Sequence, residues 1–209
     1  TEKMNISKSM IVREVSRACG VRFDSPLVSY EGDRVRLTMS QLSIFDLEIG
    51  SSQHIFNNSE LCGDCINYFN NGMGSMVMIL SDGMGTGGSA AVDSNMAVSI
   101  ISKLLKAGLS YDCALQVVNS SLMIKSEDET LATLDVADFN MFTGKMKLLK
   151  AGACTTYIKK NSKLYKKDMS SLPVGILNEV KFAKEDITLT SGDIMLMVSD
   201  GVMVDSDNW

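Results

Sequence analysis

The feature that most restricts the fold is a long run of strand-like segments that follows two consecutive helical patterns. Helical spacing covers residues 89–107, which end at Ala107-Gly108, and residues 110–124, where Ser110 is a suitable N-cap. From about residue 130 to residue 201 the sequence then alternates short β-type runs with turn residues. A doubly wound sheet requires strands and helices to alternate, so this order predicts an α+β protein with antiparallel sheets and helices packed outside them.

The first third of the sequence contains a helix and several strand patterns. Apolar residues recur with helical spacing over residues 5–19, and Gly20 is a natural stop. Strand patterns follow at RVRLTMS (34–40) and SIFDLEIG (43–50). Residues 64–70 and 75–80 are expected to form a hairpin joined by the turn NNGMG.

Composition limits the classes of protein that the chain can represent. Its 209 residues are 45% hydrophobic and 22% charged, values typical of a folded globular protein. The net charge of −5 argues against a nucleic-acid-binding surface. No apolar run approaches the length of a membrane span and no signal peptide is recognisable, and we interpret the chain, which begins at Thr1, as a fragment of a longer protein.

The five cysteines indicate reduced thiols rather than disulfides, because their number is odd and no secretory signal accompanies them. Cys62 and Cys65 form a single CxxC pair. A zinc site would need further ligands, for which only His54 and Cys154 are available. We therefore favour structural or incidental thiols over a metal or redox role, and we interpret His54 as structural.

The glycine-rich stretch that begins at Gly83 matches the pattern GxGxxG, which raises the possibility of a dinucleotide-binding turn. Such a turn should be followed by a helix, a parallel strand and then an acidic residue about twenty residues on. Here the first helix leads into a second helix, so the context does not fit a dinucleotide site.

Two apolar runs end in the same tripeptide, Ser-Asp-Gly. They are MVMILSDG (76–83) and IMLMVSDG (194–201), and a further Gly-Asp lies at residues 63–64. Each Asp-Gly could be no more than a turn. Two strand ends that each carry an aspartate could instead present oxygen ligands on a rigid base, and such ligands suit Mg²⁺ or Mn²⁺. We favour a metal site.

These motifs resemble those of the PP2C-like, metal-dependent serine/threonine phosphatases, and in particular the phosphatase domain of the stage II sporulation protein E family. The residues that carry the resemblance are CGD (62–64), LSDGMG (80–85) with Gly87, LPVGI (172–176) and VSDG (198–201). The helices and strands between them match in order, so the resemblance covers nearly the whole chain.

The resemblance implies a PP2C-like αββα sandwich of two antiparallel sheets flanked by helix pairs, with two Mn²⁺ or Mg²⁺ ions at one edge. Asp82 would bridge the two ions, the Gly83 carbonyl would bind one of them, Asp64 would serve the second ion and Asp200 the first. Asp82 and Asp200 are thus the residues expected to be essential for catalysis. The family's last metal aspartate lies in an Asp-Asp motif that this sequence does not reach, so we expect the domain to lack its last strand and the first metal site to be incomplete.

The resemblance also implies a biological role. Residues 1–40 are expected to be a helix and strand that end a preceding regulatory segment, and residues 41–209 the phosphatase domain. The implied substrate is a phosphoserine on an anti-anti-sigma factor, whose dephosphorylation activates a sporulation sigma factor. The domain would be cytoplasmic, in a parent protein held in the cell membrane by an N-terminal region. A homodimer is one of the assemblies that the resemblance allows. The alternatives are a catalytically silent PP2C-like interaction module and a nucleotide-binding protein.

Overall fold

The computed structural model describes residues 7–55, 61–85, 88–125 and 130–202. The chain folds into two compact units, Thr1–Asp46 and Leu47–Trp209. The motif residue Gly87 lies outside the described residues.

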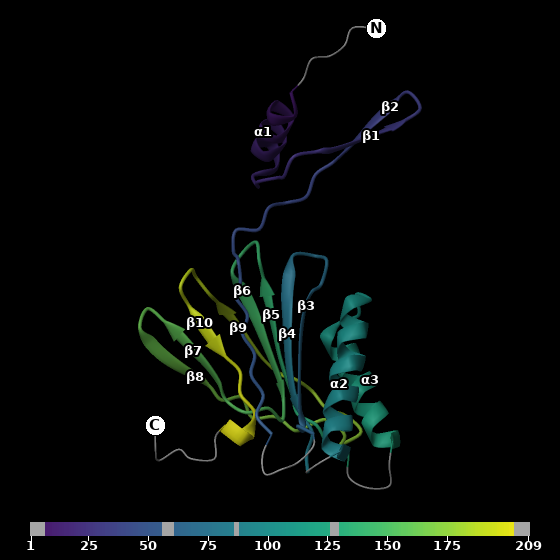
Figure 1. The fold of residues 1–209 in the computed structure, drawn as a ribbon, viewed down its shortest axis with the longest axis vertical. Helices are drawn as coiled ribbons and strands as arrows, with labels where there is room; N and C mark the ends of the chain where they lie inside the picture. Colours follow the sequence, from purple (N-terminus) through teal and green to yellow (C-terminus); the bar gives the residue numbers. More distant parts are fainter. Residues whose placement is uncertain (1–6, 56–60, 86–87, 126–129, 203–209) are drawn as a thin grey trace. The chain divides into compact units, whose positions relative to one another are not determined.

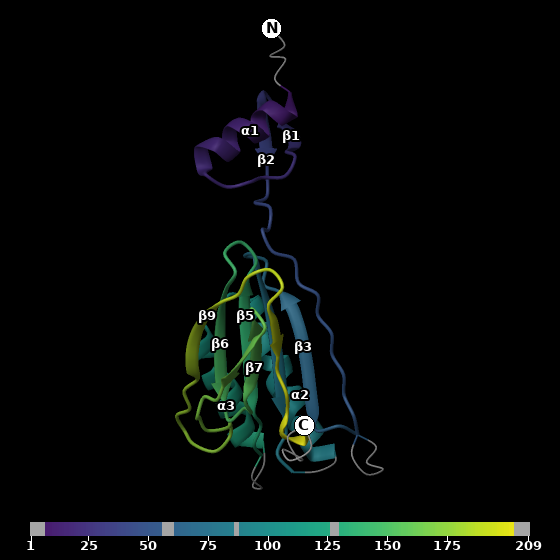
Figure 2. The ribbon, with the colours of Figure 1, turned by 90° about the vertical axis from the view of Figure 1, so that its left-hand side faces the viewer.

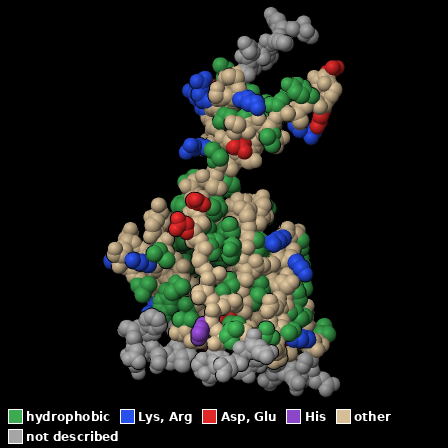
Figure 3. Space-filling model, viewed as in Figure 1, with side chains coloured by type: hydrophobic (Ala, Val, Ile, Leu, Met, Phe, Trp, Pro, Cys, Tyr) green, Lys and Arg blue, Asp and Glu red, His purple; other side chains and the backbone are tan. Residues whose placement is uncertain are grey.

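The first unit contains one helix and one hairpin, and its hydrophobic side chains are largely exposed (Figure 3). Helix α1 (Lys8–Cys19) begins at Ser7, whose hydroxyl accepts a hydrogen bond from the Met10 amide. It ends at Gly20, which adopts a left-handed conformation and donates to the Ser16 carbonyl, as the sequence predicted.

Strands β1 (Leu27–Glu31) and β2 (Arg34–Thr38) form the hairpin of this unit. The strand predicted at 34–40 is confirmed, but the strand predicted at 43–50 is wrong, because these residues are irregular. The partner of β2 comes before it in the sequence: Gly32, with a φ of 61°, makes a tight turn that folds β2 back onto β1. An alternating pattern makes a strand only where another strand can pair with it, and the sheets formed by the described residues do not include residues 43–50.

The second unit is built on two antiparallel sheets (Figure 1). The five-stranded sheet has the order β3-β4-β5-β6-β9, and the three-stranded sheet has the order β10-β7-β8. The strands are β3 (Asp64–Asn70), β4 (Ser75–Asp82), β5 (Leu134–Asn140), β6 (Lys145–Ala151), β7 (Thr156–Lys160), β8 (Lys163–Lys167), β9 (Ala183–Thr188) and β10 (Ile194–Leu196).

Helices α2 (Gly88–Lys106) and α3 (Tyr111–Lys125) cover one face of the five-stranded sheet, and the three-stranded sheet lies on its other face (Figures 1 and 2). The burial of β4 alternates along the strand. Val77 and Ile79 pack in the core with Val98 and Ile101 of α2. These layers confirm the predicted α+β class, and the part of the chain that the structure describes contains one helix pair on the larger sheet.

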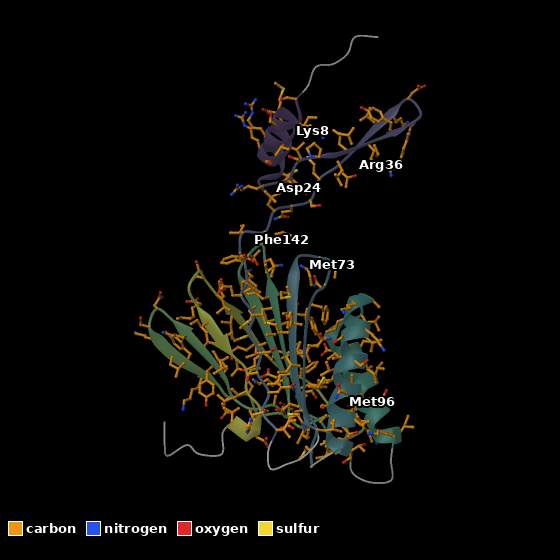
Figure 4. The ribbon with its side chains drawn as sticks, viewed as in Figure 1. Lys8, Asp24, Arg36, Met73, Met96 and Phe142 are labelled. Carbon is orange, nitrogen blue, oxygen red and sulfur yellow. The ribbon has the colours of Figure 1, made fainter. Side chains whose placement is uncertain are left out.

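The hairpin of β3 and β4 is held by the predicted turn at residues 71–74. Asn71 accepts hydrogen bonds from the amides of Met73 and Ser75 through its side chain. Phe142, from the neighbouring β5–β6 turn, lies beneath Gly74, where an added Cβ would be 1.9 Å from its ring; Figure 4 shows Phe142 and Met73 at the same end of the sheet. The turn is therefore closely packed from below.

The last predicted strand is shorter than expected. It ends at Leu196 rather than continuing to Ser199, and Asp200 begins the short 3₁₀ helix η1 (Asp200–Val202). Ile194, Met195 and Leu196 pair with β7, and the chain then leaves the sheet. The sequence pattern could not reveal this, because an apolar run continues through Val198, which is buried outside the strand.

Candidate metal centre

Asp64 and Asp82 lie directly opposite each other at the open end of the β3–β4 hairpin. Asp64 is the first residue of β3 and Asp82 the last of β4, and both are partly buried. Directly opposed side chains of an antiparallel pair point to the same face, and like charges there repel each other. The fold thus places two carboxylates together at an energetic cost that a cation between them would offset.

Gly83 follows Asp82 and is fixed by its neighbours on three sides. Its amide donates to the Gly63 carbonyl at 3.2 Å, and it forms an isolated bridge with Ala132. An added Cβ on Gly83 would lie 1.9 Å from the carbonyl oxygen of Ala90, in the first turns of α2. Glycine is needed at this position because the helix backbone comes so close.

The LPVGI motif (172–176) supports the same end of the sheet. Val174 exchanges backbone hydrogen bonds with Ala132, which itself bridges to Gly83. The buried side chain of Asn119, on α3, accepts a hydrogen bond from the Gly175 amide and donates to the Leu177 carbonyl. Helix α3 is thus connected through this motif to the backbone beside the aspartates.

Asp200 joins the two aspartates from the other sheet. Its neighbour Ser199 donates a hydrogen bond to Asp64 Oδ2 at 2.8 Å. Burial, followed by the carboxylates of Asp64 and Asp200, raises the pKa of Asp82 to about 7. Asp64 and Asp200 therefore both interact electrostatically with Asp82.

A cavity of about 350 Å³ lies beside these residues, between the ends of the two sheets. Asp82, Gly83 and Asp200 contribute to its walls, and so do Asp135 and Cys154. Proximity to this acidic site affects Cys154: burial raises the pKa of its thiol first, and the charges of Asp200 and Asp82 raise it further. The thiol is therefore protonated near neutral pH and is a poor ligand for a soft metal.

The residues fit a hard divalent cation. Their donors are oxygens only, which suits Mg²⁺ or Mn²⁺ rather than zinc. Across the described ranges, no three His, Cys, Asp or Glu side chains form a ready-made cage for a cation, so the Gly83 carbonyl and water would have to complete the coordination shell. Burial, and after it the charges of Asp64 and Asp200, raises the pKa of Asp82, and a cation bound beside these carboxylates would offset that effect.

The CxxC residues lie apart from this chemistry. All five cysteines of the chain are free thiols. Cys65 contacts Asn95 Oδ1 on α2, and the Cys62 thiol faces the His54 carbonyl at 3.9 Å. The structural role of both thiols and of His54 stays a prediction.

Sequence reasoning missed two groups at the site. Thr133 binds the backbone of Asp82 on both sides: its Oγ1 accepts from the Asp82 amide and its own amide donates to the Asp82 carbonyl. Asp135 lines the cavity from β5, two residues further along. In the sequence, Asp135 is one of two aspartates in this strand, and such a residue is usually solvent-facing.

Comparison with known proteins agrees with this architecture. A family model for stage II sporulation protein E (SpoIIE) matches residues 72–208. The stage II sporulation protein E of Bacillus subtilis (strain 168) is 32% identical over 140 residues, which are 67% of this chain and 17% of that protein. The chain therefore spans only a small part of that relative's length.

Two solved structures share the fold. The PP2C phosphatase domain with a fragment of the regulatory domain of SpoIIE from Bacillus subtilis has a TM-score of 0.77 at 24% identity, over 95% of this chain and 60% of that one. RsbX in complex with magnesium has a TM-score of 0.57 at 16% identity, over 84% of this chain and 78% of that one. The fold of the second unit is thus that of the PP2C phosphatases.

Proposed function

The chain belongs to the stage II sporulation protein E family, and from this premise we propose that it is a metal-dependent protein serine phosphatase. The predicted family and the predicted PP2C-like fold are both confirmed. The observation that carries the proposal is the meeting of Asp64, Asp82 and Asp200 with the Gly83 backbone beside one cavity. These oxygen donors would suit divalent cations, and the proposed reaction requires no covalent phosphoenzyme.

Each residue has a distinct role in the proposed reaction. Asp64, Asp82, Asp200 and the Gly83 carbonyl would together hold two Mn²⁺ or Mg²⁺ ions, with Asp82 as the ligand shared between them. When bound, such ions lower the pKa of a coordinated water and neutralise charge on a phosphate. Ser199 holds the Asp64 carboxylate in place, and the walls of the cavity limit access of bulk water.

We propose as substrate a phosphoserine on an anti-anti-sigma factor, whose dephosphorylation would activate a sporulation sigma factor. Membership of the sporulation family supports this choice. In the same proposal the phosphatase domain acts in the cytoplasm, as part of a longer protein held in the membrane elsewhere. None of the helices within the described ranges is long and apolar enough to cross a bilayer.

The nucleotide-binding alternative is less well supported. A glycine-rich phosphate site needs backbone amides that are free to bind the phosphate. Here the Gly83 amide donates to Gly63 and the Met84 amide donates to Leu131. The silent-module alternative keeps the fold and loses only the chemistry, so activity must decide it.

The test is release of phosphate from a phosphoserine anti-anti-sigma factor by the full-length protein, with and without Mn²⁺. Asp82→Asn should lower the rate by on the order of a hundredfold or more, because a charged ligand is lost while the size of the side chain is kept. Asp186→Asn, on the exposed edge of β9, is the matched control and should keep the parent rate. If the parent binds the phosphoprotein but releases no phosphate with Mn²⁺ present, the chain is a silent module.

A further inference from the structure

Asp135 lies on the same face of the sheet as the metal aspartates, one strand further in. Its register partner across β4 is Leu80, two residues before Asp82. Side chains alternate along a strand, so Leu80, Asp82 and Asp135 all face the three-stranded sheet. Asp82 and Asp135 are diagonal neighbours, a relation that places Cβ atoms roughly 7–8 Å apart.

The Asp135 side chain is almost completely buried, with 1% of its surface exposed. Oδ2 accepts two hydrogen bonds, from Lys150 Nζ at 2.5 Å and from Thr156 Oγ1 at 3.0 Å. Oδ1 is buried and has no hydrogen-bond partner among the residues that the structure describes. A buried acceptor without a donor destabilises the folded state, and a charged acceptor does so more strongly.

Lys150 does not supply that donor. Its side chain is fully buried, and its ammonium group is bound to Asp135 Oδ2 and to the Cys154 carbonyl, each at 2.5 Å. Thr156 is likewise occupied at Oδ2. Asp135 also lines the cavity described above, and Asp82, Gly83 and Asp200 line the same cavity. Water or another group held in this cavity is therefore the candidate donor for Oδ1.

The charges around Asp135 favour a hydrated ion over direct ligation. Lys150 already neutralises the carboxylate, and its positive charge would repel a bare divalent cation placed next to it. A water in the hydration shell of a cation held by Asp82 would instead donate a hydrogen bond without bringing the ion close. Buried carboxylates that orient the inner ligands of an ion commonly act in this way.

We propose that Asp135 is a positioning residue that anchors the hydration shell of the cation at the metal centre through its unpartnered Oδ1. This inference rests on the proposed function, because it requires the cation to bind at Asp82. The alternative is that the pair only ties the two sheets together, since Asp135 and Lys150 lie on β5 and β6 and Thr156 lies on β7. That role explains the contacts of Oδ2 but leaves Oδ1 without a purpose.

The experiment measures the Kd for Mn²⁺ alone, by calorimetry, together with the thermal unfolding of each metal-free protein. The main variant is the double substitution Asp135→Val with Lys150→Met, which removes both buried charges at once. Replacing a buried ion pair by apolar residues of similar size is often neutral for stability or even favourable. Asp135→Asn, which keeps the size of the side chain, is the second variant.

Asp138→Asn is the matched control. Asp138 is on the same strand, accepts a hydrogen bond from Tyr111 and also has one buried, unpartnered oxygen, Oδ1. It belongs to the opposite face of β5, because three positions separate it from Asp135 along the strand. Its substitution should leave the Kd for Mn²⁺ within about twofold of the parent value.

We expect the folded double variant to bind Mn²⁺ about 10- to 100-fold more weakly than the parent, with little change in unfolding temperature. A folded double variant with the parent Kd overturns the inference while the proposed function stands. If the double variant does not fold, Asp135→Asn decides by the same criterion, and failure of both to fold assigns the pair to structure alone. If the parent shows no saturable Mn²⁺ binding that Asp82→Asn abolishes, both the inference and the proposed function are overturned.

Discussion

The two Ser-Asp-Gly segments are identical in sequence but differ in how the structure holds them. In the first, Ser81 is fully buried and donates to the Thr133 carbonyl at 2.6 Å, and Asp82 is bonded to Thr133 through both its amide and its carbonyl. In the second, Asp200 is exposed in a 3₁₀ turn, and side chains connect it to the site: Ser199 donates to Asp64, and the Asp200 carboxylate interacts with Asp82. One copy is fixed by sheet backbone and the other by side chains.

This difference indicates that the two segments are held at the site with unequal rigidity. The first segment, from β4, is placed by the ladder of the larger sheet and would give a bound cation a rigid base. The second lies in η1, beyond the end of β10, and the sheet ladder does not include it. Matched substitutions in the two copies should therefore have unequal effects.

The largest contrast is expected for the two glycines. Gly83→Ala would place a Cβ 1.9 Å from the Ala90 carbonyl oxygen, so the helix or the strand must shift, at a cost of about 1–3 kcal/mol in the free energy of unfolding. Because the shift moves the Gly83 carbonyl itself, Mn²⁺ affinity should also fall by on the order of a hundredfold. Gly201→Ala meets no atom within 4 Å and should change both quantities little. Denaturant titration and calorimetry with Mn²⁺ measure the two effects, and equal losses in both variants would contradict the comparison.

A smaller effect is expected from the protonation of Asp82, which should change the Kd for Mn²⁺ about tenfold per pH unit. Its pKa of about 7 means that below pH 7 a proton must leave before a cation can bind. The Kd for Mn²⁺ should therefore fall as the pH rises from about 5 to 7 and level off above pH 7. Asp200→Asn removes one of the charges that raise this pKa, so the break in the curve should move to lower pH.

The raised pKa of Asp82 also affects the free energy of unfolding of the metal-free protein, which should fall as the pH rises. The folded state holds the Asp82 proton more tightly than the unfolded state, so this contribution to stability is complete below about pH 4 and is lost as the pH rises through 7. Thermal unfolding of the metal-free protein at about pH 5 and about pH 8 checks it, with Asp82→Asn as the variant that should lack this component.

The smallest contrast is expected for the two serines. Ser81→Ala removes a buried hydrogen bond to Thr133 and should lower the free energy of unfolding by about 1 kcal/mol. Ser199→Ala should cost less stability, because its hydroxyl is only partly buried, but should weaken Mn²⁺ binding several-fold by releasing the Asp64 carboxylate. A Ser199→Ala protein that loses stability and keeps its Mn²⁺ affinity would show that the second segment is a structural contact.

Much of this arrangement could be predicted from the sequence, because turn residues and helix caps act locally. Gly20 ends α1 and the NNGMG turn joins β3 to β4 as predicted. The roles of Asp64, Asp82, Gly83 and Asp200 as ligands remain predictions that their convergence supports.

The pairing of buried charges could not be predicted. Lys150 and Asp135 become neighbours only through the register of β5 on β6, and Thr156 reaches Asp135 only because the two sheets pack face to face. In the sequence each of these residues looks like an ordinary polar position on a half-exposed strand. The missing strand at 43–50 has a similar cause, since pairing depends on distant neighbours and not on local pattern.

The tight turn at residues 71–74 has a consequence for the site at the other end of its hairpin. Asp64 faces Asp82 only because the number of residues in that turn sets which positions of β3 and β4 meet. A change of one residue in its length would slide one strand past the other, and every side chain of the slipped strand would then change face. The turn contains none of the proposed ligands, yet its length sets the register that places Asp64 opposite Asp82. Phe142 packs against Gly74 in this turn and leaves little room for a different turn conformation.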